Sequence, residues 1–201
     1  MIKPKNLSPN QDARKLPITM LVLHYTGMET GEAAFEKLLD PAAKVSAHYL
    51  VDETGKVTQM VDEGRRAWHA GVSFWNGISD VNSASVGIEI VNGGHDFDLP
   101  KFPKAQITGL LKLCRKIVRA YNIADHNIVG HSDIAPSRKK DPGEKFPWKE
   151  MAKRGVGFWP SGIKSDHRVL FEQGSSDRAI SILQRGLSYI CLLYTSPSPR
   201  D

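Results

Sequence analysis

Residues 85–91, Ser85-Val-Gly-Ile-Glu-Ile-Val91, form an apolar run that a single acidic residue interrupts. A short run of this kind is typical of a buried β-strand. Alternate side chains of a strand point to opposite faces, so residues 86, 88 and 90 share one face and Glu89 points from the other. Burying an unpaired charge is costly. Glu89 is therefore expected either to form a structural salt bridge or to have a function.

Two other apolar runs predict buried strands that lead to histidines. Pro17-Ile-Thr-Met-Leu-Val-Leu-His24 ends at one, and Asn127-Ile-Val-Gly130 leads directly to His131. A histidine that closes an apolar strand is more often a packed core residue than a ligand. His48 lies inside a further predicted strand, and we interpret it as structural.

The pattern also predicts a hairpin and two helices. Residues 46–51 and 56–61 flank a turn and are typical of a β-hairpin. Residues 30–39 and 105–121 carry apolar side chains at helical spacing, and Cys114 falls on the buried stripe of the longer helix. Strands that alternate with helices, together with one hairpin, predict a mixed α/β fold with a central mixed β-sheet flanked by helices.

The segment from Gly130 to Gly143 is dense in titratable side chains, with one imidazole, two carboxylates and three cations. Pro136, Pro142 and Gly143 exclude a regular helix through it, so we expect a loop of fixed shape. Rigid loops that follow strands often carry catalytic and binding residues. The alternative is a solvated polar loop.

Two imidazoles and a carboxylate, from His24, His131 and Asp141, become a candidate ligand set because strand ends converge in a sheet. Three protein ligands and an open fourth position are typical of a catalytic zinc, whereas a structural zinc has four. Spacing alone makes this a weak signal.

The composition is that of an ordinary globular protein, with 40% hydrophobic and 24% charged residues among 201. A net charge of +5 suits an anionic partner, but no basic run is interleaved with aromatics, so no nucleic acid is expected. Cys114 and Cys191 predict neither a disulfide framework nor a zinc knuckle. Residues 1–16 are polar and expected to be irregular.

Neither a signal peptide nor a membrane span is visible in the sequence as written. We therefore expect a cytoplasmic protein, and a monomer. If the start of the chain is misassigned, a periplasmic or wall-associated location is the alternative.

Four motifs occur along the chain: His24-Tyr-Thr, Trp68-His-Ala-Gly, Val86-Gly-Ile-Glu-Ile, and Gly130-His-Ser-Asp-Ile-Ala-Pro with Lys139-Lys-Asp-Pro-Gly143. Together they resemble the zinc-dependent N-acetylmuramoyl-L-alanine amidases of the AmpD and AmiD type (amidase type 2). That family shares its fold with the peptidoglycan recognition proteins. The resemblance covers roughly residues 6–160.

The resemblance implies that His24, His131 and Asp141 bind one Zn²⁺ and that Glu89 and Lys139 are catalytic. The implied reaction is hydrolysis of the amide bond between the lactyl group of N-acetylmuramic acid and L-alanine of the stem peptide. The substrate would be peptidoglycan or its muropeptide turnover fragments. Glu89 would act as general base and then acid. Lys139 would stabilise the oxyanion together with the zinc.

Several residues near these motifs are candidates for substrate binding. Trp68 and His69 are expected at the wall of a groove, although a place at the edge of the core is an equal alternative. Arg138 or Lys140 could pair with stem-peptide carboxylates, for which Arg is the better suited, or could simply be solvated. Asp133 is as well explained by stabilisation of the loop as by catalysis.

We expect three parts in the chain. Residues 1–160 would be the catalytic zinc amidase domain. Residues 161–190 would be a linker and the truncated start of a helical peptidoglycan-binding domain. Residues 177–190 resemble the first helix of such a domain, and the alternative is a lone amphipathic helix. Residues 191–201 resemble the translation of a sequencing adaptor.

Two other functions stay open from the sequence. One is a non-catalytic peptidoglycan-binding module, as in family members that lack a zinc ligand. The presence of all three ligands, with Glu89 and Lys139, argues against it. The other is a zinc hydrolase of a different amide, which a metal site alone does not exclude.

Overall fold

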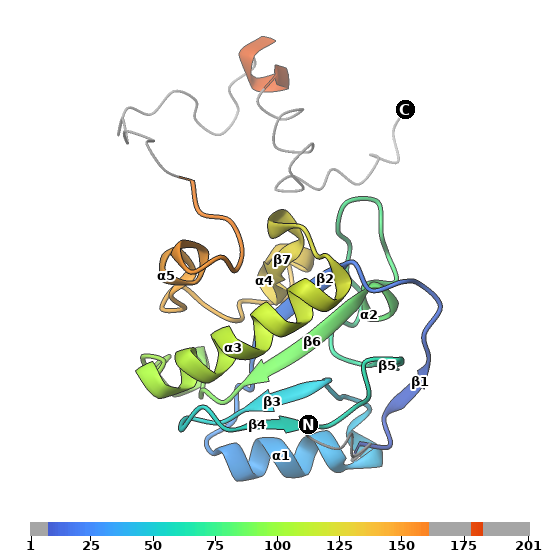
Figure 1. Cartoon of the computed structure of the whole chain (residues 1–201), viewed down its shortest axis with the longest axis vertical. Helices are drawn as coiled ribbons and strands as arrows, with labels where there is room; N and C mark the ends of the chain where they lie inside the picture. The colour runs from blue at the N-terminus through green and yellow to red at the C-terminus, as the bar shows by residue number, and fades with distance from the viewer. Residues whose placement is uncertain (1–7, 161–177, 183–201) are drawn as a thin grey trace.

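The computed structural model describes residues 8–160 and 178–182. Its centre is a five-stranded sheet in which β4 pairs antiparallel with β3, and β3, β6, β2 and β7 run parallel to one another. The mixed α/β fold with a central mixed sheet is therefore confirmed (Figure 1). The strands of this sheet are β2 (Met20–Tyr25), β3 (Tyr49–Val51), β4 (Val57–Gln59), β6 (Ser85–Ile90) and β7 (Ile128–Gly130).

Helices lie on both faces of this sheet, and the two longest within residues 8–160 are those that the sequence predicts. The α-helices of this range are α1 (Gly31–Leu39), α2 (Val81–Ala84), α3 (Lys104–Tyr121), α4 (His131–Ile134) and α5 (Trp148–Lys153), with short 3₁₀ turns η1 (Pro41–Ala43), η2 (His95–Phe97) and η3 (Asp125–Asn127). Thr30 caps α1 by accepting a hydrogen bond from the Ala33 amide, and Asp40 ends it.

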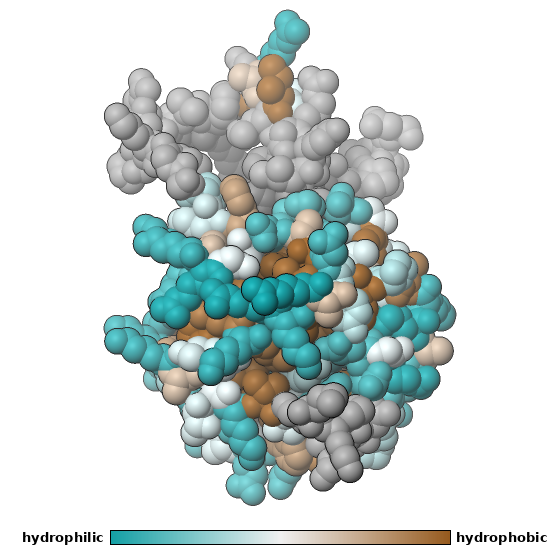
Figure 2. Space-filling model, in the orientation of Figure 1, coloured by the Kyte–Doolittle hydropathy of each residue, from teal (hydrophilic) through white to brown (hydrophobic). Residues whose placement is uncertain are grey.

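One face of the sheet is packed against α3 and forms the main core. Val86, Ile88 and Ile90 of β6 point to this side and cluster with Leu110 and Ile117 of the helix. Cys114 is fully buried in the same cluster, as its place on the apolar stripe predicts. The outward side of α3 is charged, and Figure 2 shows hydrophilic side chains lying along it. The face of the sheet that α3 covers therefore forms the core and has a structural role.

The opposite face carries the polar residues of interest, because side chains alternate along the strands. His24 on β2 lies beside Glu89 on β6 in the parallel register, so both side chains leave the sheet on the same side. Below them on this side, Met20 and Val22 pack against Trp75, Val81 and Ile134. Next to them, Leu38 of α1 and Leu50 of β3 form another small cluster with Met60 and Val91.

The N-terminal segment differs from the prediction. It is not wholly irregular, because β1 (Gln11–Ala13) pairs antiparallel with β5 (Arg65–Ala67) in a separate two-stranded sheet. Arg66 joins the two strands to α2, since its guanidinium contacts Asp12 at 3.0 Å and Asp80 at 3.1 Å. The strands are too short and polar to show a period in the sequence.

The loop from Gly130 to Gly143 also differs in one detail. It begins with a single helical turn, α4, which ends before Pro136. The prolines exclude a longer helix, as expected, but the first four residues after β7 are free to form one turn. This turn fixes the direction in which His131 leaves the strand.

The predicted helix at 177–190 is described only at residues 178–182, which are helical. The adaptor-like stretch at 191–201 and most of the proposed linker lie outside the described residues. Among the described residues, no helix is both long and apolar enough to cross a membrane.

Candidate metal centre

Three ligand-type atoms converge at the C-terminal edge of the parallel strands. His24 Nδ1 lies 2.9 Å from His131 Nδ1 and 3.0 Å from Asp141 Oδ2, and His131 Nδ1 lies 3.1 Å from the same oxygen. All three residues are buried, between 1% and 6% exposed. The structure thus brings together the three residues that the sequence predicts as ligands.

The loop after β7 is folded back so that His131 and Asp141 lie side by side. The Ser132 amide donates to the Asp141 carbonyl at 2.9 Å, which closes the loop. A side chain at residue 130 would obstruct this closure, because a Cβ on Gly130 would lie 2.6 Å from Pro142 Cδ. Asp133 accepts a hydrogen bond from the Gly130 amide at 2.7 Å, so it stabilises the loop.

The chemistry of this donor set fits a metal ion. His131 Nε2 lies 3.0 Å from the Ala70 carbonyl, which only accepts, so Nε2 carries the ring proton. Nδ1 of His131 then presents a lone pair toward Asp141 and His24. Lone pairs that converge in a buried place repel one another unless a cation lies between them. Two imidazole nitrogens and one carboxylate oxygen are ligands that Zn²⁺ accepts.

The protonation states agree with this role. Burial, together with the neighbouring His131, lowers the pKa of His24 to about 4, although Asp141 acts in the opposite direction. Burial would raise the pKa of Asp141, but its contacts with His131 and His24 outweigh that effect and hold the pKa below its usual range. At neutral pH His24 is therefore neutral and Asp141 ionised, as metal ligation requires.

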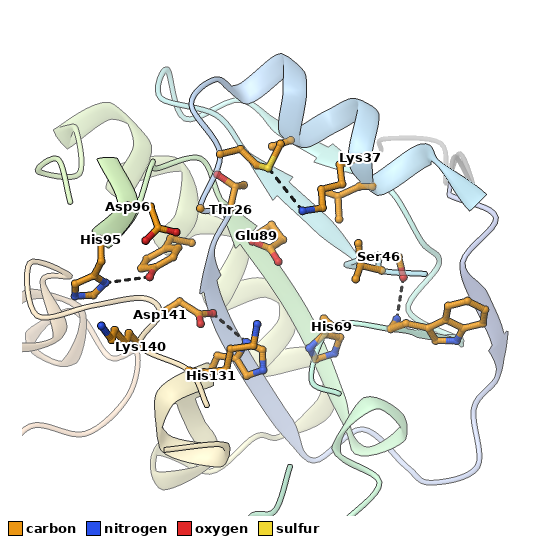
Figure 3. Close-up of a pocket in the computed structure, with 18 of the residues that line it drawn as sticks. Thr26, Lys37, Ser46, His69, Glu89, His95, Asp96, His131, Lys140 and Asp141 are labelled. Atoms are coloured by element: carbon orange, nitrogen blue, oxygen red, sulfur yellow. Dashed lines mark hydrogen bonds and ion pairs between the residues drawn. The ribbon is translucent and has the colours of Figure 1, made fainter. Parts of the chain in front are cut away.

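Glu89 points into the same pocket from the neighbouring strand (Figure 3). It forms no ion pair with any described residue, and its Oε2 is buried without a hydrogen-bond partner among them. Burial and the charge of Asp141 raise the pKa of Glu89 well above its usual value, while Lys139 and Lys37 oppose them. The structural salt bridge that the sequence left open is not formed within this part of the chain.

The pocket around these residues has a volume of about 430 Å³ and a basic rim. Lys37, Arg138, Lys139 and Lys140 all line it. Lys139 lies near enough to the centre for its charge to lower the pKa of both Glu89 and His24. Arg138 is partly committed elsewhere, because its Nη2 donates to the carbonyls of Ala70 and Val72, each at 2.7 Å.

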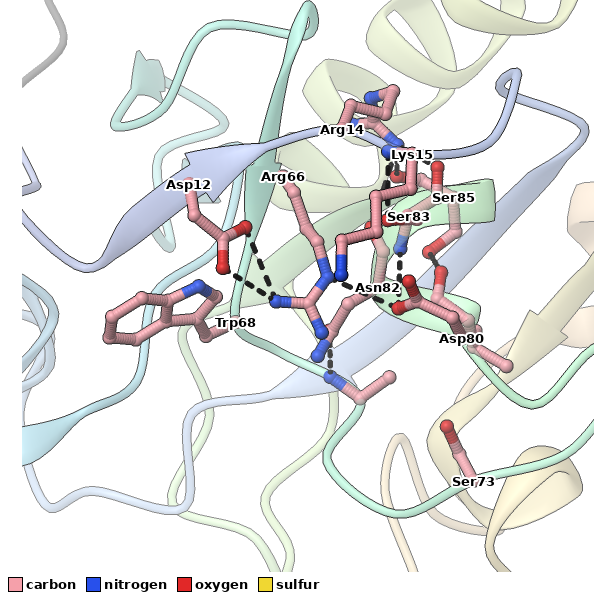
Figure 4. Close-up of polar contacts among 12 residues, drawn as sticks. Asp12, Arg14, Lys15, Arg66, Trp68, Ser73, Asp80, Asn82, Ser83 and Ser85 are labelled. Carbon is pink, nitrogen blue, oxygen red and sulfur yellow. Dashed lines mark hydrogen bonds and ion pairs between the residues drawn. The ribbon is translucent and has the colours of Figure 1, made fainter.

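Trp68 and His69 both line the pocket, but they differ in how they are held. The indole nitrogen of Trp68 is buried and has no hydrogen-bond partner among the described residues. His69 is only 8% exposed, and its ring lies behind His24 with Nδ1 3.0 Å from His24 Nε2. The side-chain oxygen of Asn82, which is labelled in Figure 4, accepts hydrogen bonds from the backbone amides of His69 and Ala70, at 2.9 and 2.8 Å.

His69 fits behind His24 only because residue 87 has no side chain. A Cβ on Gly87 would lie 2.4 Å from Cγ of the His69 ring. Glycine in the interior of a strand often marks such a close approach. The glycine between Val86 and Ile88 was therefore the sequence signal for a bulky group packed on this face.

We expect Gly87→Ala to lower the free energy of unfolding by about 1–3 kcal/mol, the usual cost of overpacking a filled interior. The ring cannot retreat easily, because it lies between His24 and Ser85. Chemical denaturation measures the loss. In a His69→Ala background the same substitution should cost much less. An equal cost in both backgrounds would contradict this packing.

The sequence is similar to a known protein family and to several named relatives. A family model described as N-acetylmuramoyl-L-alanine amidase matches residues 14–144. The chain is 41% identical over 155 residues to N-acetylmuramoyl-L-alanine amidase AmiD of Escherichia coli, a match covering 71% of this chain but only 55% of AmiD. It is 36% identical over 162 residues to 1,6-anhydro-N-acetylmuramyl-L-alanine amidase AmpD of Haemophilus influenzae, covering 71% of this chain and 86% of AmpD.

Solved structures give the same result. The complex of E. coli AmiD with anhydro-N-acetylmuramic acid-L-Ala-D-γ-Glu-L-Lys superposes with a TM-score of 0.67 at 38% identity, covering 75% of this chain and 63% of AmiD. AmpDh3 of Pseudomonas aeruginosa, in complex with an anhydromuramic pentapeptide, has a TM-score of 0.72 at 31% identity, covering 100% of this chain and 82% of AmpDh3.

Proposed function

This chain belongs to the N-acetylmuramoyl-L-alanine amidase family, and we propose that it hydrolyses the amide bond between the lactyl group of N-acetylmuramic acid and L-alanine. The substrate would be peptidoglycan or a muropeptide released from it. The name of the relative AmpD specifies a 1,6-anhydro-N-acetylmuramyl compound, and AmiD was solved in complex with an anhydro-muramyl peptide. An anhydro-muropeptide is therefore the first substrate to test.

The observation that carries this proposal is the convergence of five residues from three parts of the chain. His24 and Glu89 leave adjacent strands on the same face, and the loop after β7 adds His131, Lys139 and Asp141 to the same pocket. A metal-binding set, a half-buried carboxylate and an ammonium group are the parts that amide hydrolysis needs.

We assign the metal to Zn²⁺, held by His24, His131 and Asp141. When bound, zinc supplies Lewis acidity, which polarises a carbonyl and lowers the pKa of water to about 7. The imidazoles and the carboxylate supply a net charge of −1, so the site attracts a divalent cation without neutralising it fully. Three protein ligands leave a position open, as in catalytic rather than structural sites.

Glu89 would move the protons of the reaction. Its carboxylate accepts a proton from the attacking water as the water oxygen bonds to the lactyl carbonyl carbon. It then delivers that proton to the alanine nitrogen as the carbon–nitrogen bond breaks. A raised pKa suits this dual role, because a general base and acid works best when its pKa lies near the working pH.

Lys139 would stabilise the charge that develops on the carbonyl oxygen. Its ammonium group lines the pocket beside the metal ligands, and a fixed cation there acts in a partly water-excluded site, where such stabilisation is strongest. Lys140 and Arg138 also line this pocket. We assign them to the carboxylates of the stem peptide, and Trp68 to the wall that the sugar or peptide contacts.

Digestion of a purified anhydro-muropeptide by the zinc-loaded chain tests the proposal. We expect mass spectrometry to detect two products, the sugar with a free lactyl carboxylate and a stem peptide that begins at L-alanine. A chain that only binds muropeptides would bind without releasing peptide. A hydrolase of another amide would leave the sugar–alanine bond intact, and either result would refute the proposal.

Replacement of Lys139 by methionine should lower kcat by about 10²-fold or more, as loss of one oxyanion donor does in other hydrolases. Lys140→Met is the matched control, because it removes the same charge one residue away on the same rim. We expect it to raise KM while leaving kcat close to that of the wild type. Steady-state kinetics on the muropeptide separates the two effects. Equal losses of kcat would show that only the net charge of the rim matters.

A further inference from the structure

His69 and Ser85 form a chain of hydrogen bonds that ends at a proposed metal ligand. His69 Nδ1 lies 3.0 Å from Nε2 of His24, and His69 Nε2 lies 3.2 Å from the Ser85 hydroxyl oxygen. That hydroxyl lies 2.5 Å from the Val81 carbonyl. His69 and Ser85 are both buried, with 8% and 0% of their surface exposed. The amidase mechanism above uses neither residue.

The direction of each hydrogen bond follows from the fixed end of the chain. The Val81 carbonyl can only accept, so the single proton of the Ser85 hydroxyl points to it. The hydroxyl oxygen then accepts from His69, which places the proton of that ring on Nε2. A neutral imidazole has one ring proton, so His69 Nδ1 accepts.

The same logic extends to His24. Because His69 Nδ1 is an acceptor, the ring proton of His24 lies on Nε2. Nδ1 of His24 therefore keeps a lone pair, and it is this atom that lies 2.9 Å from His131 Nδ1 and 3.0 Å from Asp141 Oδ2.

We propose that His69 and Ser85 are positioning residues that fix the tautomer and orientation of His24, so that its Nδ1 is available to the metal ion. The inference rests on the metal site of the proposed function. Partners that hold the second nitrogen of a metal-bound imidazole typically contribute about 10–100-fold to metal affinity.

The two ligand histidines are supported in different ways, both from the segment after β5. His131 donates to the backbone carbonyl of Ala70, whereas His24 donates to the side chain of the preceding residue, His69. The side-chain oxygen of Asn82 accepts hydrogen bonds from the backbone amides of both His69 and Ala70, and thereby fixes the position of this segment. Gly87 leaves the space for the His69 ring.

A chelator challenge tests this inference, in which the zinc-loaded chain is exposed to increasing concentrations of a chromophoric chelator. His69→Gln can reach Ser85 but offers His24 no acceptor at the position of Nδ1. His69→Asn places an amide oxygen near that position. We expect His69→Gln to lose zinc at about 10–100-fold lower free chelator than the wild type, and His69→Asn to recover part of the loss.

Ser85→Ala removes one oxygen atom and leaves the His69 tautomer unfixed, so it should also release zinc more readily. Ser83→Ala is the matched control, because Ser83 is a fully buried serine two residues away whose hydroxyl accepts from the Lys15 amide instead (Figure 4). It should retain zinc as the wild type does. The absorption spectrum of the cobalt-loaded protein gives a second readout, and should shift in Ser85→Ala but not in Ser83→Ala.

Two results would overturn the inference while the proposed function stands: wild-type retention in both His69→Gln and Ser85→Ala, or an equal loss in Ser83→Ala. Chemical denaturation of each variant shows whether a loss reflects unfolding. A wild-type chain that holds no zinc would instead refute the metal site itself, and the inference with it.

Discussion

Asp141→Ala should abolish zinc retention and, with it, measurable release of stem peptide. Asp141 is 6% exposed, and its Oδ2 lies 3.0 and 3.1 Å from Nδ1 of the two proposed ligands His24 and His131. Its removal leaves two neutral ligands for a divalent ion. Because even a residue behind a ligand contributes about 10–100-fold to metal affinity, loss of a ligand should cost more than that. Metal content after dialysis, measured by elemental analysis, gives the result directly.

Asp133→Asn is the control for this loss. Asp133 lies in the same loop and accepts from the Gly130 amide, an interaction that the amide oxygen of asparagine can keep. We expect it to hold zinc and to release peptide at close to the wild-type rate. Zinc retention by Asp141→Ala, or zinc loss by Asp133→Asn alone, would show that the ligand set is wrong.

Glu89→Gln should keep zinc but lower kcat by about 10²–10⁴-fold, the usual contribution of a general acid–base group. The amide has the shape of the carboxylate but cannot take a proton from water. Metal content and single-turnover release of stem peptide, measured on the same preparation, separate binding from chemistry. A fully active Glu89→Gln would show that another group is the base.

The same variant carries a stability prediction. Burial and Asp141 raise the pKa of Glu89 in the folded protein, so the ionised carboxylate disfavours folding. The contribution of the Glu89 side chain to stability is therefore largest at pH values below its pKa in the unfolded chain. This contribution is lost as the pH rises through the higher pKa of Glu89 in the folded protein. Glu89→Gln should therefore be at least as stable as the wild type at neutral pH, and its relative advantage should shrink toward acid pH in thermal unfolding.

The elements that the sequence predicts well are those with a strong local pattern. The helix at 105–121 has an apolar stripe over its whole length, and the strands ending near His24 and His131 are continuous apolar runs. The β1–β5 ladder was missed because Gln11-Asp12-Ala13 has no apolar alternation. Its pairing depends on partners more than fifty residues away, including the contact of Arg66 with Asp12. Local periodicity contains no such information.

The candidate site also has a part that the sequence predicts and a part that it does not. The sequence predicted that His24, His131 and Asp141 would converge, because strand ends and the loop after them meet at one edge of the sheet, and the structure brings them together. The sequence did not predict that His69 would support His24. That arrangement depends on the absence of a side chain at Gly87, which leaves space for the His69 ring. It also depends on Asn82, whose side-chain oxygen accepts a hydrogen bond from the His69 backbone amide. A glycine inside a strand indicates close approach but does not name the group that approaches.

The most direct test of the central claim is to determine which product of the reaction contains the oxygen atom from water. The zinc-loaded chain is incubated with an anhydro-muropeptide in heavy-oxygen water, and both products are weighed by mass spectrometry. Hydrolysis of the lactyl amide predicts one heavy oxygen in the muramic acid carboxylate and none in the stem peptide. Heavy oxygen in a peptide carboxylate, or no cleavage by a chain that holds zinc, would contradict the account.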